Sequence, residues 1–235
     1  MRYYGLSILL ILSFLTVFSI FLGCSDSNAN INTPDIEGEV NLKMEVVTKS
    51  PIGYGASERV SPTTLISDPI ADGELQGCAI IISNIVFVTS GGKEYPVFQA
   101  RYREDGAVLL VDNGANNQVC NMINYAPEKA ITATNSIKRA EDISWLADVG
   151  ATDYKYVKIK VEEVCVSYKT SSGTTVNWHD SNYSKTILLE AGNQFSPFSI
   201  SNGSSKNFVL KFNLSGRIGK VEGEFEPDVY LIGAN

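Results

Sequence analysis

The sequence predicts an all-β fold. Short apolar runs with a period of two residues recur along the chain, and clusters of Gly, Asn, Asp and Ser separate them. β-Branched and aromatic residues, which favour strands, are frequent, whereas long apolar stripes with helical spacing are nearly absent. We therefore expect strands joined by short turns, with little helix.

The first predicted strand covers residues 39–46, where Val40, Leu42 and Met44 alternate with polar neighbours. A long loop rich in Ser, Pro and Gly follows over residues 48–76. Further strands of the first half are predicted at residues 78–89, 95–99 and 107–112.

The second half repeats this organisation after a break. Ser136 is expected to cap a helix that continues to Val149 and stops at Gly150. Strands are then predicted at residues 156–168, 176–178, 185–190, 208–214, 221–225 and 229–232.

The two strongest strands each change phase once. The apolar positions shift at Ser83-Asn84 in one strand and at Glu162-Glu163 in the other, as they do at a β-bulge. These two switches lie 79 residues apart, and the strands that follow them keep the same offset. The offset indicates a duplicated β unit, although any two bulged hairpins share much of this pattern.

A duplicated unit gives either two similar sandwiches or one pseudo-symmetric sandwich, with one short helix between the halves. We expect five segments along the chain. They are a signal peptide (1–23), a lipidated cysteine with its tether (24–37), β unit 1 (38–120), a connector (121–153) and β unit 2 (154–235).

The signal peptide is predicted from the first residues of the chain. Arg2 is the only charge before an almost continuous apolar run over residues 6–22, which is typical of a secretory signal. The run is also near the short limit for a transmembrane helix, so an uncleaved membrane anchor is the alternative.

The run ends at Phe21-Leu22-Gly23-Cys24, which resembles the lipobox of bacterial lipoproteins. In that family a small residue precedes the cysteine that receives lipid. Gly23 and Cys24 match the motif, whereas Phe21 and Leu22 depart from its usual residues. The resemblance implies cleavage before Cys24, acyl chains such as palmitate on this cysteine, and a place in the bacterial cell envelope. Ser25 after it favours the outer membrane or cell surface.

The run from residue 153 to residue 164, followed by a Gly hairpin and Trp178, resembles a second family. Its members are bacterial lipoprotein domains of unknown function with prealbumin-like sandwiches. The resemblance implies a β-sandwich, a surface or periplasmic location and no activity. We expect the fold to be a β-sandwich of immunoglobulin-like or prealbumin-like character.

The charge of the chain limits its partners. The formal net charge of the whole chain is −7. Removal of residues 1–23 would also remove the positive charge of Arg2 and make the net charge more negative. Such a surface repels phosphate backbones and gives no basic attachment to anionic lipid. We expect a membrane partner through the lipid on Cys24, a glycan or envelope protein as a further partner, no nucleic acid and no cofactor.

Two groups of side chains are candidate binding residues. Glu222, Glu224 and Asp228, together with Glu226, would place carboxylates on one strand face, where they could bind calcium or act as a catalytic pair. A solvated strand face explains the same pattern. The second group consists of aromatic residues that could line a sugar-binding face or could be ordinary half-buried strand residues: Tyr95, Tyr102, Trp178 and Tyr183.

Other reactive residues give weaker indications. His179 precedes Asp180, but neighbours in a strand point to opposite faces, so we expect a surface histidine. Cys78, Cys120 and Cys165 permit one disulfide at most, and buried unpaired thiols are the alternative.

The function expected from the sequence is that of a non-enzymatic binding, adhesion or structural module tethered to the envelope. The alternative is an extracellular carbohydrate-active or calcium-dependent domain that uses the acidic strand face.

Overall fold

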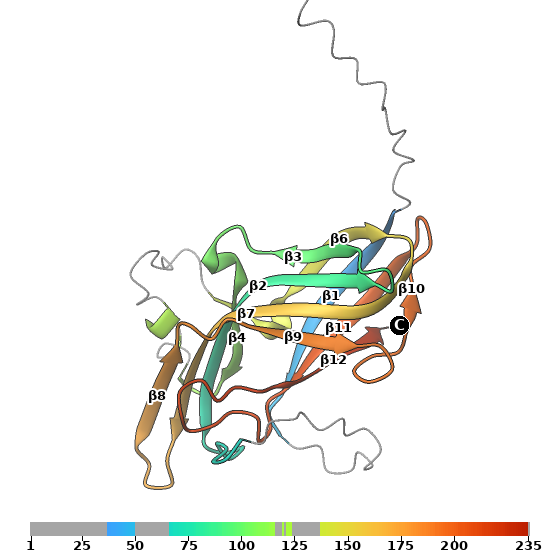
Figure 1. Cartoon of the computed structure of the whole chain (residues 1–235). Helices are drawn as coiled ribbons and strands as arrows, with labels where there is room; N and C mark the ends of the chain where they lie inside the picture. Colours follow the sequence, from blue (N-terminus) through green and yellow to red (C-terminus); the bar gives the residue numbers. More distant parts are fainter. Residues whose placement is uncertain (1–36, 50–65, 116–118, 120, 124–136, 235) are drawn as a thin grey trace, which may run out of the picture. The chain divides into compact units, whose positions relative to one another are not determined.

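The computed structural model describes residues 37–49, 66–115, 119, 121–123 and 137–234. These residues belong to one compact unit, residues 36–235, made of two β-sheets packed face to face (Figure 1). The predicted all-β sandwich is confirmed.

The smaller sheet has the strand order β12-β11-β1-β6. β1 pairs in parallel with β11 and antiparallel with β6. The predicted alternation in β1 is confirmed, because Val40, Leu42 and Met44 are buried while their neighbours are exposed or half-buried. The bounds are β1 Glu37–Val47, β6 Ser144–Gly150, β11 Ser205–Asn213 and β12 Asp228–Ala234.

The larger sheet is built on two long antiparallel strands, β2 and β7, which run side by side in Figure 1. The N-terminal half of each strand pairs with one short strand, and the C-terminal half pairs with another. The bounds are β2 Leu75–Thr89, β3 Glu94–Gln99, β4 Ala107–Asp112, β5 Lys138–Arg139, β7 Asp153–Lys169, β8 Thr175–Asp180, β9 Lys185–Glu190 and β10 Phe198–Ser199.

The predicted phase switches lie at the centre of the β2–β7 ladder. Ile82 pairs with Val161, and the register shifts on both sides of this pair, so that Ser83 and Glu162 are each left out of the ladder. The Oγ of Ser83 donates a hydrogen bond of 2.9 Å to Oε1 of Glu162. Each strand therefore carries a bulge, and the two bulges face each other.

The pairing also repeats at the offset of 79 residues that separates Ser83 from Glu162. The hairpin strand β3 pairs with the C-terminal half of β2 as β8 pairs with that of β7. β4 then pairs with the N-terminal half of β2 as β9 pairs with that of β7. The two predicted units thus contribute equivalent strands to one sheet, related by a local twofold axis between Ile82 and Val161.

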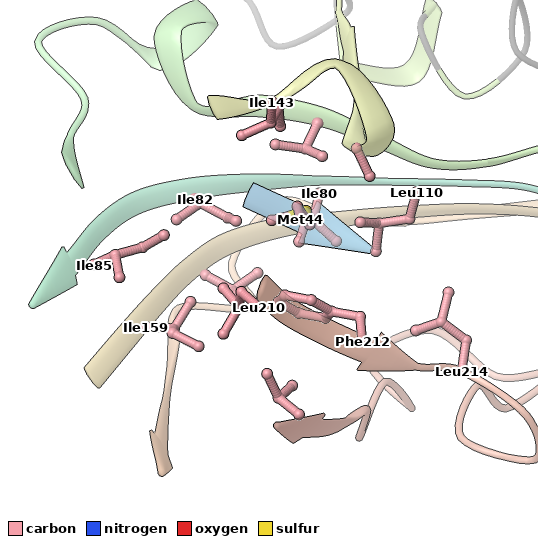
Figure 2. Close-up of a cluster of buried hydrophobic side chains, with 14 of the residues drawn as sticks. Met44, Ile80, Ile82, Ile85, Leu110, Ile143, Ile159, Leu210, Phe212 and Leu214 are labelled. Carbon is pink, nitrogen blue, oxygen red and sulfur yellow. The ribbon is translucent and has the colours of Figure 1, made fainter. Parts of the chain in front are cut away.

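The main core lies between the sheets. Figure 2 shows a part of it, in which Ile82 of β2, Ile159 of β7 and Leu210 of β11 belong to one buried cluster. Phe87 is fully buried and makes edge-to-face contacts with Tyr154 and Phe208. Burial of this apolar surface is the main stabilising term of the fold.

Two predicted elements are wrong. The helix expected to reach Val149 is replaced by the short 3₁₀ turn η2 (Ala140–Asp142) and β6. Trp145, Ala147 and Val149 alternate toward the core, whereas Leu146 is 67% exposed. Pairing with β1 overrides a weak helical pattern. Helix does occur at residue 119, at the end of the first predicted unit, and at residues 121–123, at the start of the predicted connector.

The strand expected at residues 221–225 is instead a loop closed by a turn at Glu222-Gly223. Gly223 has a positive φ of 84°, which reverses the chain direction and is incompatible with a continuous strand. The following strand, β12, is confirmed.

Candidate functional site

The outer face of the larger sheet, which points away from the smaller sheet, has two unlike halves. We call the part over β4 and β8 the covered half, because Val119 and Ile123 pack on it and form a second small core. The part over β3 and β9 is the open half. The sheet residues of the covered half's core are Ala79, Ile81, Ala107, Leu109 and Cys165.

A polar cluster lies at the covered half. Glu163 of β7 is 9% exposed, and its carboxylate accepts two hydrogen bonds from Arg103, at 2.6 Å to Nε and 2.5 Å to Nη2. Nε2 of His179 lies 3.0 Å from Oε2 of the same carboxylate. Arg103 belongs to the 3₁₀ turn η1 (Arg103–Gly106), and its Nη1 donates to the backbone carbonyl of Ile123.

Two opposing effects act on the Glu163 carboxyl. Burial raises the pKa of this carboxyl, whereas the hydrogen bonds and the charges of Arg103 and His179 lower it. The lowering effects together outweigh the effect of burial, so the pKa lies below its ordinary value. The buried carboxylate of Glu163 is therefore charged and is stabilised by Arg103 and His179. The cluster binds η1 and the segment at Ile123 to β7, which is a structural role.

The open half carries a groove instead of a cover. It has a volume of about 420 Å³, within the usual range for small-molecule sites. Nine residues line the groove: Ser83, Asn84, Val86, Glu94, Gln99, Ala100, Lys158, Lys160 and Thr186. Amides, hydroxyls and ammonium groups thus surround a floor that includes the buried side chain of Val86.

The charged groups of the groove are already engaged. Nζ of Lys158 lies 2.6 Å from Oε1 of Glu94. Nζ of Lys160 donates to both the backbone carbonyl and the hydroxyl of Ser184, each at 2.9 Å. Oδ1 of Asn84 is buried and accepts no hydrogen bond from the described residues. A buried acceptor without a donor is costly, and such atoms are rare in native proteins.

The four candidate aromatic residues do not form one sugar-binding face. Trp178 and Tyr183 are buried in the core, where the indole N–H donates to Gly219 and the phenol donates to the carbonyl of Phe225. Tyr95 packs edge-to-face against Tyr154. Tyr102 is 57% exposed beside η1.

The four candidate carboxylates are likewise separated, because the strand that would have aligned them is a turn. Glu226 pairs with Lys185 at 2.6 Å, and Asp228 pairs with Arg217 at 2.9 Å. Oε1 of Glu224 accepts a long hydrogen bond from Ser67. Glu222 is exposed in the turn. Within the described ranges no group of three or more His, Cys, Asp or Glu side chains is placed to hold a metal ion.

The cysteines lie in different surroundings. Cys78 belongs to the core between the sheets, and burial raises the pKa of its thiol. Cys165 belongs to the second core on the opposite face of the same sheet, so these two cysteines do not form a disulfide with each other. Cys120 lies outside the described residues.

The sequence singled out His179, but it did not indicate that His179 and Arg103 both contact Glu163. It also did not indicate the residues of the groove as a site. His179 and Asp180 do not act as a pair, since Asp180 accepts a hydrogen bond from the backbone N–H of Asn182. A signal for two of the missed residues was present in the sequence, because Asn84 and Glu163 are equivalent positions of the two phase switches.

Comparisons with known proteins give little further information. No family model matches the chain, and no curated protein matches it. Among solved structures, MbnP from Methylosinus trichosporium matches 74% of this chain and 76% of its own, with 11% sequence identity and a TM-score of 0.32. A likeness this distant carries no argument about ligand or activity.

The predicted anchor, including Cys24 and the apolar run at residues 6–22, lies outside the described residues. In the part of the chain that the structure describes, no helix is long and apolar enough to cross a membrane.

Proposed function

We propose that this protein is an exported lipoprotein of the bacterial cell envelope, whose β-sandwich serves as a non-enzymatic binding module. The observation that carries the proposal is Gly23-Cys24 at the end of an apolar run that follows a single basic residue. β1 begins at Glu37, so a short polar tether would join the lipidated cysteine to the sandwich.

The lipid would do the anchoring alone. The chain is acidic and has no basic cluster that attracts anionic lipid. One acyl chain binds a membrane only marginally, whereas two or three chains on one cysteine bind durably. Ser25 next to this cysteine favours placement in the outer membrane or at the cell surface.

The groove of the open half supports a binding role. It combines an appropriate volume with polar side chains on a rigid sheet, as ligand sites commonly do.

The test of the anchor is the intact mass of the membrane-extracted protein, compared with Cys24→Ala and with Ser25→Ala as the matched control. We expect the wild type and Ser25→Ala to have the mass of residues 24–235 plus acyl chains. Cys24→Ala should lose this product.

Two outcomes contradict the proposal. A mass that corresponds to all 235 residues in every variant would identify residues 6–22 as an uncleaved membrane helix. A product cut elsewhere and released from the membrane would show free secretion.

A further inference from the structure

The strand β8 has an open outer edge. In the described part of the chain β8 pairs only with β7, and Figure 1 shows it at the margin of the molecule. The N–H of Thr170 donates to the carbonyl of Thr174, and such hydrogen-bonded pairs return at every second residue of an antiparallel ladder. The residues between them, Thr175, Asn177 and His179, therefore turn their backbone N–H and C=O groups away from β7. No described residue hydrogen-bonds to these backbone groups.

The other outer strands are protected, as the edges of native sheets usually are. β3 contains Pro96 and lies beside β6, where the rings of Phe98 and Trp145 have centroids 4.8 Å apart. β9 lies beside β12. β5 and β10 are each two residues long, and both residues of β5 are basic.

β8 has none of these protections. It is six residues long and contains no Pro, Lys or Arg, and its pairing with β7 has no bulge. An edge of this kind is a template for one further strand, which would bind through backbone hydrogen bonds.

The side chains of β8 indicate which strand fits. A second copy of β8 matches when it runs antiparallel to the first with its Asn177 opposite Asn177. The pairs across the new ladder, one residue from each copy, are then Asn177 with Asn177, Thr175 with His179, and Val176 with Trp178. Polar residues thus meet polar residues on the outer face, and apolar residues meet on the core side, where Val176 and Trp178 belong to the main core.

The same register also matches the charges and the backbone. Asp180 is the only acidic residue of β8, and it would lie opposite Thr174 of the second copy, so no two carboxylates face each other. Thr175, Asn177 and His179 are the residues with outward backbone groups, and in this register they pair with one another. Each such pair exchanges two hydrogen bonds, which satisfies every open backbone group of the edge.

From these observations we propose that β8 pairs antiparallel with β8 of a second copy of this chain, so that two larger sheets join into one continuous sheet. A twofold axis passes beside Asn177, and both copies use the same surface. This inference goes beyond the proposed binding function and depends neither on the lipid anchor nor on the groove. Six residues a side bury less than the roughly 1,200 Å² of a standard interface, so we expect a dimer that dissociates on dilution.

The test is oxidative crosslinking of cysteine variants of the full chain, purified in detergent. Asn177→Cys places two thiols opposite each other with Cα atoms about 5.5 Å apart, a separation that a disulfide spans. Thr175→Cys is the matched control, because Thr175 is exposed on the same edge and face. Its two copies would lie about 14 Å apart, four residues along the ladder. The wild type reports any crosslinking by the native cysteines.

We expect Asn177→Cys to form the disulfide-linked dimer about tenfold or more faster than Thr175→Cys, since only the first pair has the geometry of a disulfide. The same oxidation in cell membranes should give the same dimer. Slow crosslinking of both variants would overturn the proposal. Equal fast crosslinking of both would do so too, because it would indicate random collision or parallel pairing.

A second variant tests the register without a crosslink. Asn177→Lys places two ammonium groups opposite each other at the axis, which should weaken the dimer about fivefold in sedimentation measurements. The melting temperature should change little, because the side chain of Asn177 is exposed. Asn207→Lys is the matched control, since Asn207 is an exposed strand residue of the smaller sheet.

Two further results would contradict the proposal. Equal dimer affinities of Asn177→Lys and Asn207→Lys would show that the axis does not pass beside Asn177. A crosslink of Asn177→Cys to a different protein in cell membranes, with no crosslinked dimer, would show that the edge binds another partner. The mass measurement of the lipid anchor is independent of each of these outcomes.

Discussion

The two halves of the outer sheet face have equivalent backbones but opposite exposures. Leu109 in the covered half and Leu188 in the open half occupy equivalent positions of β4 and β9. Leu109 is 6% exposed, whereas Leu188 is 51% exposed. The same residue type on the same scaffold is therefore core in one half and surface in the other.

The difference lies in the neighbouring side chains. Ala79 and Ile81 of the covered half correspond, at the offset of 79 residues, to Lys158 and Lys160 of the open half. Apolar side chains favour a cover that removes them from water, while lysines lose hydration when covered. The side chains of each half thus match its exposure: apolar residues lie under the cover, and lysines line the groove.

The largest expected effect concerns Gly106, which ends η1 and places Arg103 over the covered half. A Cβ atom at Gly106 would lie 1.8 Å from the backbone carbonyl oxygen of Ile82. We expect Gly106→Ala to lower the free energy of unfolding by about 3 kcal/mol or more, because backbone must move. Urea-induced unfolding measures this change.

Gly73→Ala is the matched control. An added Cβ at Gly73 meets no atom within 4 Å, so its unfolding free energy should change little. Equal effects of the two substitutions would show that close packing of η1 on β2 does not hold the cover.

The next largest effect is expected for Arg103→Met. The Arg103 and Glu163 side chains are only 17% and 11% exposed, so the substitution leaves a buried carboxylate with His179 as its remaining partner. We expect the free energy of unfolding to fall by about 2 to 3 kcal/mol.

Lys158→Met provides the comparison from the open half, because it also breaks an ion pair. Lys158 and Glu94 are 43% and 51% exposed, and such pairs contribute less than about 1 kcal/mol. If both methionine variants lost the same stability in urea, the covered half would not differ energetically from the open half.

The smallest effect is a pH dependence that Glu163 adds. The pKa of its carboxyl is lower in the folded protein than in the unfolded chain, so its stabilisation is complete above the ordinary value of 4.5. The stabilisation is then lost as the pH falls through the lowered pKa.

Glu163→Gln should therefore reduce the loss of stability on acidification below about pH 4.5, measured by urea unfolding at a series of pH values. If Glu163→Gln lost as much unfolding free energy on acidification as the wild type, Arg103 and His179 would not stabilise the Glu163 carboxylate.

Much of the fold could be predicted from the sequence, but little of the candidate site. The alternation in β1 and the phase switches at Ser83 and Glu162 depend on local spacing, which is visible in one dimension. The groove depends on which strands become neighbours: Asn84 lies beside Gln99 on one side and Lys160 on the other. No local pattern reports that arrangement.

The wrong predictions have the same origin. Trp178 and Tyr183 appear as available aromatic residues in the sequence, yet the loop around Gly219 and Phe225 accepts their polar hydrogens and buries their rings. The acidic series near the C-terminus appears to be a strand face, and a turn at Gly223 divides it.

The sequence by itself determined the strand pattern, the bulges and the repeat, because these follow from the alternation of side chains along an extended backbone. It also contains the lipobox-like motif that predicts an anchor. The tertiary structure decided which half of the outer face is covered. The guanidinium of Arg103 in η1 reaches Glu163, but Oδ1 of Asn84 receives no hydrogen bond from the described residues. Side-chain hydrogen bonding on a sheet depends on neighbours that are brought together from distant parts of the chain.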